Sequence, residues 1–266
     1  MILLTLLITV LLEYYFNLGA PLRRWHWFER YSQFIENLVL KYFPHPSEVG
    51  LMAAMLAPIV LLVGLLQSVL KVPFWGMLDL IFGVVILLMT VEAKPLIKAY
   101  MQTKEDNDVL SAGLTDNPSH HHHQTFAQFL RTEKERLLCP VLWYILLGPM
   151  GAVMYRLSVA LVQLGGNERQ KKLAKRWLGW LEWLPVRLSV ISFAVVDNFL
   201  PCFQYWLGTL GLGANRNDDV LIDGAAHASS IKAQATVKPE SIGLIAHSLI
   251  FWLVLVAILT VTTWVN

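Results

Sequence analysis

The chain has 266 residues, of which 56% are hydrophobic and 15% are charged, and its mean hydropathy is +0.52. This composition is too apolar for a soluble domain, whose surface must be covered by polar side chains. The formal net charge of +2 gives no general attraction to nucleic acid, so no nucleic-acid partner is expected. The lipid bilayer is therefore the expected surroundings of much of the chain.

The first apolar segment is residues 2–20. Its N-terminal part is about as long as the apolar core of a signal peptide. It lacks a basic segment in front and a small-residue cleavage site, and it continues through Glu13 into aromatic residues. We therefore expect a retained membrane anchor.

Residues 49–70, 74–92 and 242–265 are three further apolar segments. Each is close to the roughly 20 residues that an α-helix needs to cross the hydrocarbon core of a bilayer. Only Lys71–Val72–Pro73 separates the first two, which predicts an antiparallel hairpin. With residues 2–20, these segments predict about four spanning helices.

Two more apolar stretches, residues 138–163 and 183–213, are interrupted. Gly148–Gly151, with Pro149 inside it, breaks the first, and Asp197–Pro201 breaks the second. Proline removes a backbone donor and glycine weakens a helix. Each stretch can form one kinked span, or two half-length helices that enter and leave by the same membrane face.

The positions of the basic residues favour the second alternative, because Lys and Arg concentrate in cytoplasmic loops. If both broken stretches turn back, all the strongly basic connections lie on the cytoplasmic side. These connections are residues 21–48, 93–137, 164–183 and 214–241. The sequence thus predicts an all-α, polytopic membrane helical bundle in a bacterial inner membrane. We expect a single integral membrane domain over residues 1–266, with both termini outside.

An amphipathic segment, residues 167–184, lies between the two broken stretches. Four basic residues lie on one side, and five apolar residues are available on the other: Lys171, Lys172, Lys175 and Arg176 against Leu173, Trp177, Trp180, Leu181 and Trp183. This pattern is typical of a helix that lies at the boundary between headgroups and acyl chains. Residues 214–241, in contrast, are expected to be a cytoplasmic linker.

A run of four histidines, His120–His123, lies in a polar, turn-rich stretch. Neutral imidazoles are good ligands for zinc, nickel or copper. A histidine tract in such a stretch is only a compositional signal, because a functional site draws its ligands from a folded scaffold. We therefore predict neither a metal site nor a cofactor.

Ionisable residues inside apolar segments are the stronger candidates for a site, since burying a charge costs several kcal/mol unless it finds a partner or water. Four such residues are Glu13, Arg156, Arg187 and Asp197. They can form ion pairs that fix how the helices pack, or they can bind a ligand. Glu182 lies at a segment end, where its side chain can reach the surface.

Two blocks of sequence look familiar, and the first is Leu181-Glu182-Trp183-Leu184-Pro185-Val186-Arg187-Leu188, behind a basic helix. This block resembles the D-x-x-P-x-R-L region of the AmpE family of inner-membrane proteins, which is linked to beta-lactamase induction. Cys139–Trp143, followed by Leu147–Ala152 and Tyr155–Leu157, is similar to the A-P-L-F-W, G-P-x-G-A and Y-R stretch of the same superfamily. That superfamily also contains the cobalamin-biosynthesis membrane synthase CobD/CbiB.

Two departures separate the chain from the synthase. Gly19-Ala20-Pro21 replaces an acidic Gly-Asp-Pro, and Arg131–Arg136 replaces a Glu-Asn-x-x-Asp-Gly box, although Glu133 and Glu135 lie within it. Such acidic and amide groups would hold a metal-phosphate or an activated carboxylate.

The AmpE-like resemblance instead implies a regulatory or accessory role in beta-lactamase induction and cell-wall signalling, without catalytic turnover. Its partner would be a membrane or cytoplasmic protein. A divergent membrane amide synthase is the alternative. The candidate ligand or polar-core residues are Glu13, Glu135, Arg156, Arg187 and Asp197.

Overall fold

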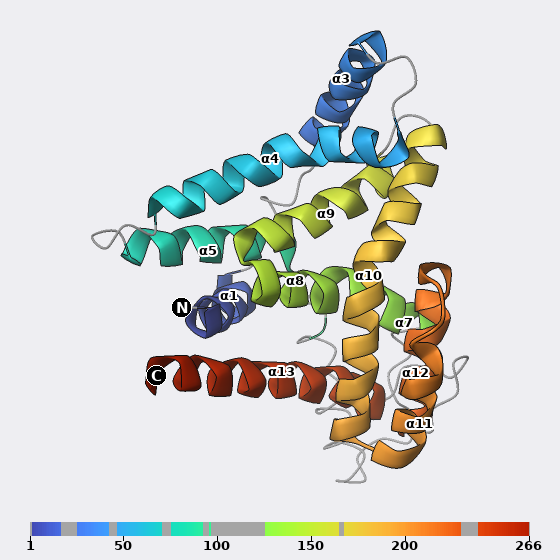
Figure 1. Cartoon of the computed structure of the whole chain (residues 1–266). Helices are drawn as coiled ribbons and strands as arrows, with labels where there is room; N and C mark the ends of the chain where they lie inside the picture. The colour runs from blue at the N-terminus through green and yellow to red at the C-terminus, as the bar shows by residue number, and fades with distance from the viewer. Residues whose placement is uncertain are drawn as a thin grey trace, which may run out of the picture. The chain divides into compact units, whose positions relative to one another are not determined.

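A computed structural model describes residues 2–16, 26–42, 47–70, 76–92, 96, 126–164, 168–229 and 239–265. Every regular element in these ranges is helical, which confirms the predicted all-α class (Figure 1). The chain forms two compact units, residues 1–92 with 139–183 and residues 93–138 with 184–266. Each unit is described by itself, and the single membrane domain stays a prediction. The polar stretch with His120–His123 lies outside the described residues.

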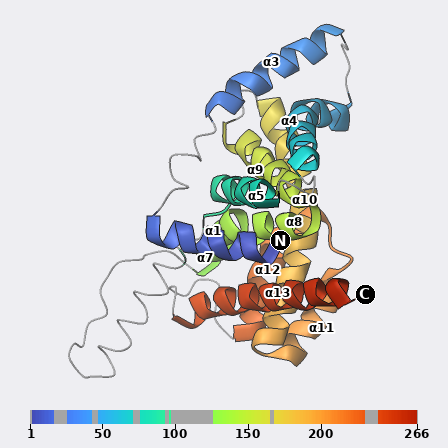
Figure 2. The same ribbon diagram turned by 90° about the vertical axis from the view of Figure 1, so that its left-hand side faces the viewer.

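Among the described residues of the first unit are six complete helices and the first half of another. They are α1 (Ile2–Phe16), α3 (His26–Tyr42), α4 (Glu48–Leu70), α5 (Gly76–Thr90), α8 (Cys139–Leu147), α9 (Pro149–Leu164) and the start of α10 (Glu168–Val196). Helices α4, α5 and α9 lie side by side, and α1 crosses α5 (Figures 1 and 2). The Tyr144 hydroxyl of α8 donates to Thr5 Oγ1 of α1 at 2.9 Å, which ties α1 to this layer.

Helices α4 and α9 are antiparallel, and their contact forms the main core of the first unit. At one end, Gly64 of α4 lies against Met150 of α9. At the other end, apolar residues from four helices pack together. These are Phe28 of α3, Leu51, Met52, Met55 and Leu56 of α4, Leu157 and Leu161 of α9, and Leu173 and Ala174 of α10.

The first broken stretch forms a helical hairpin. Gly148 has φ +68°, a left-handed conformation that glycine adopts without steric cost, and it separates α8 from α9. Cys139, at the start of α8, packs against Tyr155 and Val159 in the middle of α9. The chain therefore turns back after Gly148, so of the two alternatives for residues 138–163 it adopts two half-length helices.

Helix α10 corrects two expectations for residues 167–213. It continues through Pro185 to Val196, so the amphipathic segment and the start of the second broken stretch form one helix. Pro185 has no N–H to donate to the carbonyl of Leu181. The Trp143 indole N–H donates to that carbonyl instead, at 3.1 Å, which compensates for the missing bond.

The apolar face of the amphipathic segment is also not where we expected it. Leu173, Leu178 and Leu181 are buried in the core of the first unit, so they are not available to acyl chains. Trp180, in contrast, is exposed. Four basic residues of α10 are exposed: Arg169, Lys172, Lys175 and Arg176. The segment is amphipathic, as predicted, but its apolar side faces protein.

The second unit contains α7 (Phe126–Glu133), the π-helix η1 (Lys134–Leu138), the second half of α10, α11 (Phe199–Thr209), the 3-10 helix η2 (Ala214–Arg216), α12 (Asn217–Ser229) and α13 (Pro239–Val265). The chain breaks after Asp197 and α11 folds back along α10. The Trp206 indole N–H donates to the carbonyl of Arg187 at 2.9 Å, and Cys202 Sγ lies 3.4 Å from the carbonyl oxygen of Val190. The second broken stretch is therefore also a hairpin.

Helix α12 corrects the expectation of a linker over residues 214–241. Residues 217–229 are helical, and Val220, Leu221 and Ala225 are fully buried. Gly224 of α12 lies so close to Val190 of α10 that a Cβ would be 2.7 Å from both of its methyl groups. Close packing on α10 therefore holds this segment as a helix.

Two helices in the described part of the chain are long and apolar enough to cross a membrane, namely α4 and α10. Of these two, α4 coincides with a predicted span, residues 49–70. Residues 2–13, 77–90 and 242–258, from the other three predicted spans, are shorter apolar helices within the described ranges. Helix α10 was not predicted to be a span.

Candidate functional site

The structure divides the five candidate residues between the two units. Glu13 is buried in α1 and Arg156 is half-buried in α9, both in the first unit. Glu135 is half-buried in η1, Arg187 is buried in α10, and Asp197 is exposed at the break before α11. Neither unit brings all five together. Arg187 makes hydrogen bonds to three residues of the second unit.

Arg187 connects α10 to the end of α11 and the start of α12. Its side chain is 2% exposed, and Nη1 donates to Asn217 Oδ1 at 2.5 Å. Nη2 donates to the carbonyl of Leu212 at 3.0 Å and reaches that of Thr209 at 3.5 Å. Carbonyl groups at the end of a helix lack intrahelical partners and carry partial negative charge. The guanidinium therefore joins α10 to acceptors at the end of α11 and the start of α12.

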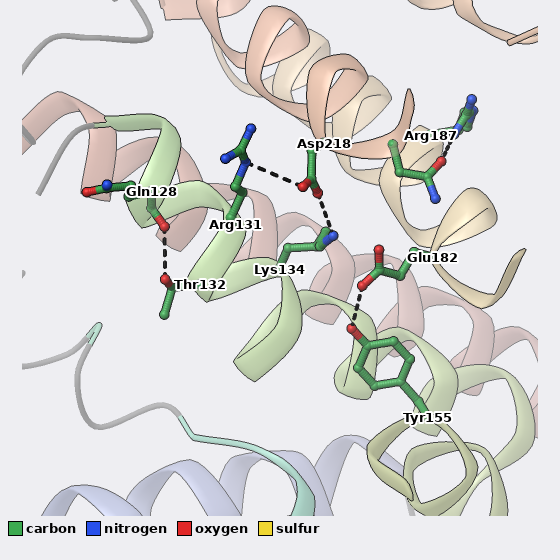
Figure 3. Close-up of polar contacts among 9 residues, drawn as sticks. Gln128, Arg131, Thr132, Lys134, Tyr155, Glu182, Arg187 and Asp218 are labelled. Atoms are coloured by element: carbon green, nitrogen blue, oxygen red, sulfur yellow. Dashed lines mark hydrogen bonds and ion pairs between the residues drawn. The ribbon is translucent and has the colours of Figure 1, made fainter. Parts of the chain in front are cut away.

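The next residue of α12, Asp218, binds two cations from a different part of the chain. Lys134 Nζ of η1 donates to Asp218 Oδ1 at 2.7 Å, and Arg131 Nε of α7 lies 3.4 Å from Asp218 Oδ2 (Figure 3). A carboxylate in the first turn of a helix also interacts favourably with the helix dipole. Two consecutive residues at the start of α12 therefore hold α10, α11 and the α7–η1 segment.

We refer to Arg131, Lys134, Arg187, Asn217 and Asp218 as the α12 junction. Sequence reasoning found only Arg187 of these five. Lys134 and Asp218 are 84 residues apart, and no local pattern pairs them. One available signal was Pro140, which cannot donate to the carbonyl of Arg136 and so favours the wider π-helical turn that contains Lys134.

Two buried polar contacts in the first unit were also missed. The Tyr155 hydroxyl of α9 donates to Glu182 Oε1 of α10 at 3.1 Å (Figure 3). Glu182 is buried, whereas we expected its carboxylate to reach the surface. Gln170 of α10 donates to the buried carboxylate of Glu36 in α3. The first contact joins two consecutive helices, and the second joins helices 134 residues apart at the bonded positions.

In the α12 junction, Asn217 binds Arg187, and Asp218 binds Lys134 and Arg131, so the start of α12 is joined to α10, η1 and α7. This arrangement holds helices in a defined packing, which is one of the two roles that we considered for the buried charges. Among the described residues, no group of three or more His, Cys, Asp or Glu side chains is placed to hold a metal ion.

Replacing Asp218 by Asn tests how strongly the junction binds Lys134. The Lys134 side chain is 5% exposed, so it would lose its anionic partner in a largely buried place. Asp218 itself is 44% exposed, so solvent screens the pair and we expect a loss of about 1 kcal/mol in unfolding free energy. A double-mutant cycle with Lys134→Met measures the coupling. If Asp218→Asn lowered the unfolding free energy equally with and without Lys134, the predicted coupling of the two residues would be wrong.

Comparisons with models of protein families, with curated proteins and with solved structures found no match to this chain.

Proposed function

We propose that the chain is a regulatory or accessory inner-membrane protein of the AmpE type, which acts in beta-lactamase induction and cell-wall signalling without catalytic turnover. The observation that carries the membrane part is the exposure of α4. Only 28% of the 18-residue apolar window of this 23-residue helix is buried. The core helix of a soluble protein would be mostly covered. In a bilayer, the exposed apolar surface of α4 contacts lipid, which avoids the free-energy cost of its contact with water.

The exposed side of α4 consists of large aliphatic side chains in its second half: Leu61, Leu62, Leu65, Leu66 and Val69. A continuous apolar surface of this kind is typical of a lipid-facing helix. The corresponding window of α10 is 56% buried, twice the share found for α4, so less of its apolar surface is available to lipid. We assign the span to α4.

The proposed topology follows from this assignment and from the two hairpins. Residues 2–20, 74–92 and 242–265 supply the other three spans, and the hairpins of α8 with α9 and of α10 with α11 enter and leave by one face. The exposed basic residues of α10 then lie on the cytoplasmic side, as basic loops prefer.

The regulatory part of the proposal rests on the AmpE-like blocks and on the contacts of Arg187. This residue belongs to the Leu-Pro-x-Arg-Leu block, and its donors bind Asn217 and the carbonyls of Thr209 and Leu212. Those contacts support a positioning role for the block, in which it holds helices that a partner protein would contact.

Cysteine labelling in spheroplasts tests the topology. We expect Lys71→Cys, between α4 and α5, to react with a membrane-impermeant maleimide from outside. Lys172→Cys should react only after the membrane is permeabilised, because it lies in the basic segment of α10. The native cysteines, Cys139 and Cys202, are both buried, and the unsubstituted protein provides the blank. Outside labelling of Lys172→Cys would overturn the proposed topology.

Deletion of the gene tests the regulatory function, in a bacterium that encodes this chain and an inducible beta-lactamase. We expect the deletion to change the beta-lactamase activity induced by a beta-lactam, and the wild-type gene to restore it. Unchanged induction would contradict the proposed pathway. Turnover of an acyl or nucleotide substrate by the purified protein would contradict the absence of catalysis.

A further inference from the structure

Helix α3 has two apolar faces, of which only one is covered. Phe28, Ser32 and Glu36 are buried, and Phe28 belongs to the core of the first unit. A second set of large side chains is exposed: Trp27, Phe34, Leu38 and Tyr42. At 3.6 residues per turn, these four fall within roughly 80° of the helix circumference. We call them the α3 stripe.

Aromatic packing anchors the start of α3. The Tyr31 ring stacks on Phe28 at a centroid distance of 5.8 Å, and Trp27 of the α3 stripe lies against both rings. Burial raises the pKa of the Tyr31 hydroxyl, so the group stays neutral beside the core. Trp27 is nevertheless exposed, as are the other three residues of the α3 stripe.

Positive charge flanks the α3 stripe. Arg30 and Lys41 are both exposed, and their positions place them along one edge of the stripe. The two acidic residues of α3 lie toward its covered side, where Glu36 is buried and Glu29 is half-buried. The exposed surface of α3 therefore combines aromatic rings with cations. That combination matches the headgroup region of an anionic bilayer, where Trp and Tyr accumulate and basic side chains reach phosphates.

The position of α3 along α4 agrees with this match. Helix α3 lies across the first half of α4 (Figure 2). Phe28 belongs to the same core cluster as Leu51, Met55 and Leu56. With a rise of about 1.5 Å per residue, Leu51–Leu56 lie roughly 5–12 Å from the start of α4. A helix at a membrane surface is buried to roughly 5–10 Å in the boundary between headgroups and acyl chains. The exposed aliphatic part of α4 begins beyond that depth.

We propose that α3 is the membrane-surface helix of this protein, with the α3 stripe inserted among the headgroups of an anionic bilayer and Arg30 and Lys41 bound to lipid phosphates. This inference rests on the proposed span of α4. It replaces α10 in the interfacial role, because Leu173, Leu178 and Leu181 of α10 are buried in protein. The Gln170–Glu36 contact joins α3 to α10, so the exposed basic residues of α10 add to the positive charge that faces the same lipids.

The test uses the full-length protein in nanodiscs with an environment-sensitive fluorophore on single added cysteines. Phe34→Cys places the label on the α3 stripe. Gln33→Cys is the matched control, because residue 33 directly precedes Phe34 and points about 100° away from it on the same helix. Nanodiscs contain phosphatidylcholine with or without phosphatidylglycerol, and a lipid spin-labelled near the headgroup serves as quencher. We expect quenching at position 34 to be at least about twofold stronger than at position 33, as expected for a stripe inserted at the boundary.

A double variant tests the role of the two cations of α3. Arg30→Gln with Lys41→Gln removes two exposed cations and leaves the buried face of α3 unchanged. We expect quenching at position 34 to be stronger in anionic than in neutral nanodiscs, and this difference to disappear in the double variant. Each variant is accepted only if it elutes as the wild type does in size-exclusion chromatography. A difference that persists without both cations would overturn their role.

Leu62→Cys separates this inference from the proposed function. Its label should be quenched by a lipid spin-labelled deep in the acyl chain. If position 62 is quenched and positions 33 and 34 behave alike, the α3 inference is wrong and the span stands. If position 62 is not quenched, the span of α4 is wrong and the α3 inference falls with it. Efficient disulfide formation between two copies of Phe34→Cys would instead assign the α3 stripe to an interface between copies.

Discussion

Arg187→Ala is expected to lower the free energy of unfolding by about 3 kcal/mol, because several acceptors around a buried guanidinium lose a donor together. Asn217 Oδ1 and the carbonyl of Leu212 are bonded by the guanidinium at 2.5 and 3.0 Å, and the side chain is 2% exposed. Each acceptor left unsatisfied in a buried place costs about 1–3 kcal/mol. Thermal unfolding of the purified protein in detergent, followed by tryptophan fluorescence, measures the loss.

Two variants on the same helix control this prediction. Arg169→Ala removes an exposed arginine from α10 and should change stability by no more than about 0.5 kcal/mol. Arg187→Lys keeps the charge but replaces the planar fork by a single ammonium group, so we expect partial recovery. If Arg187→Ala were as stable as Arg169→Ala, the α12 junction would not hold these helices together.

Gly151→Ala is expected to disrupt the hairpin of α8 and α9. An added Cβ would lie 2.3 Å from the carbonyl oxygen of Trp143 and 2.8 Å from Cβ of Leu147. A backbone oxygen cannot rotate away, so the two helices must separate, and overpacking of this kind costs roughly 1–3 kcal/mol or more. The same separation would move the Trp143 indole, which donates to the carbonyl of Leu181. Unfolding free energy and near-UV circular dichroism measure both effects.

Gly208→Ala is the matched control for the hairpin prediction. Gly208 is also helical, and nothing lies within 4 Å of the position that its Cβ would occupy. Alanine should therefore leave stability unchanged or raise it by about 0.5–1 kcal/mol through the lower entropy of the unfolded chain. Equal losses at the two positions would show that the close approach at Gly151 is not what limits substitution.

The sequence predicted the breaks in the chain better than it predicted the contacts. Gly148 and Asp197 interrupt the two apolar stretches where expected, because glycine and the Asp-Asn pair act on the backbone locally. The second broken stretch was expected to begin at residue 183 as an element separate from the amphipathic segment, but α10 continues through Pro185. Its lost hydrogen bond is compensated by Trp143, which is distant in the sequence, so no local pattern could reveal it.

The candidate site shows the same division. Arg187 was predicted because a charge inside an apolar segment must find a partner, and it does. Lys134 and Asp218 were not predicted, because each lies in a polar stretch where a charge needs no explanation. Their pairing depends on α12 being a helix, and that helix was interpreted as a linker.

The sequence by itself determined the helical class, the apolar segments and the positions of the turns, since these depend on composition and on residues a few positions apart. The tertiary structure decided which side of each amphipathic helix is covered. Helix α10 has its apolar side in the protein core, while α3 has a second apolar side exposed. The physical reason is that an apolar side chain is stabilised equally by lipid and by protein, so hydropathy alone does not tell which of the two surrounds it.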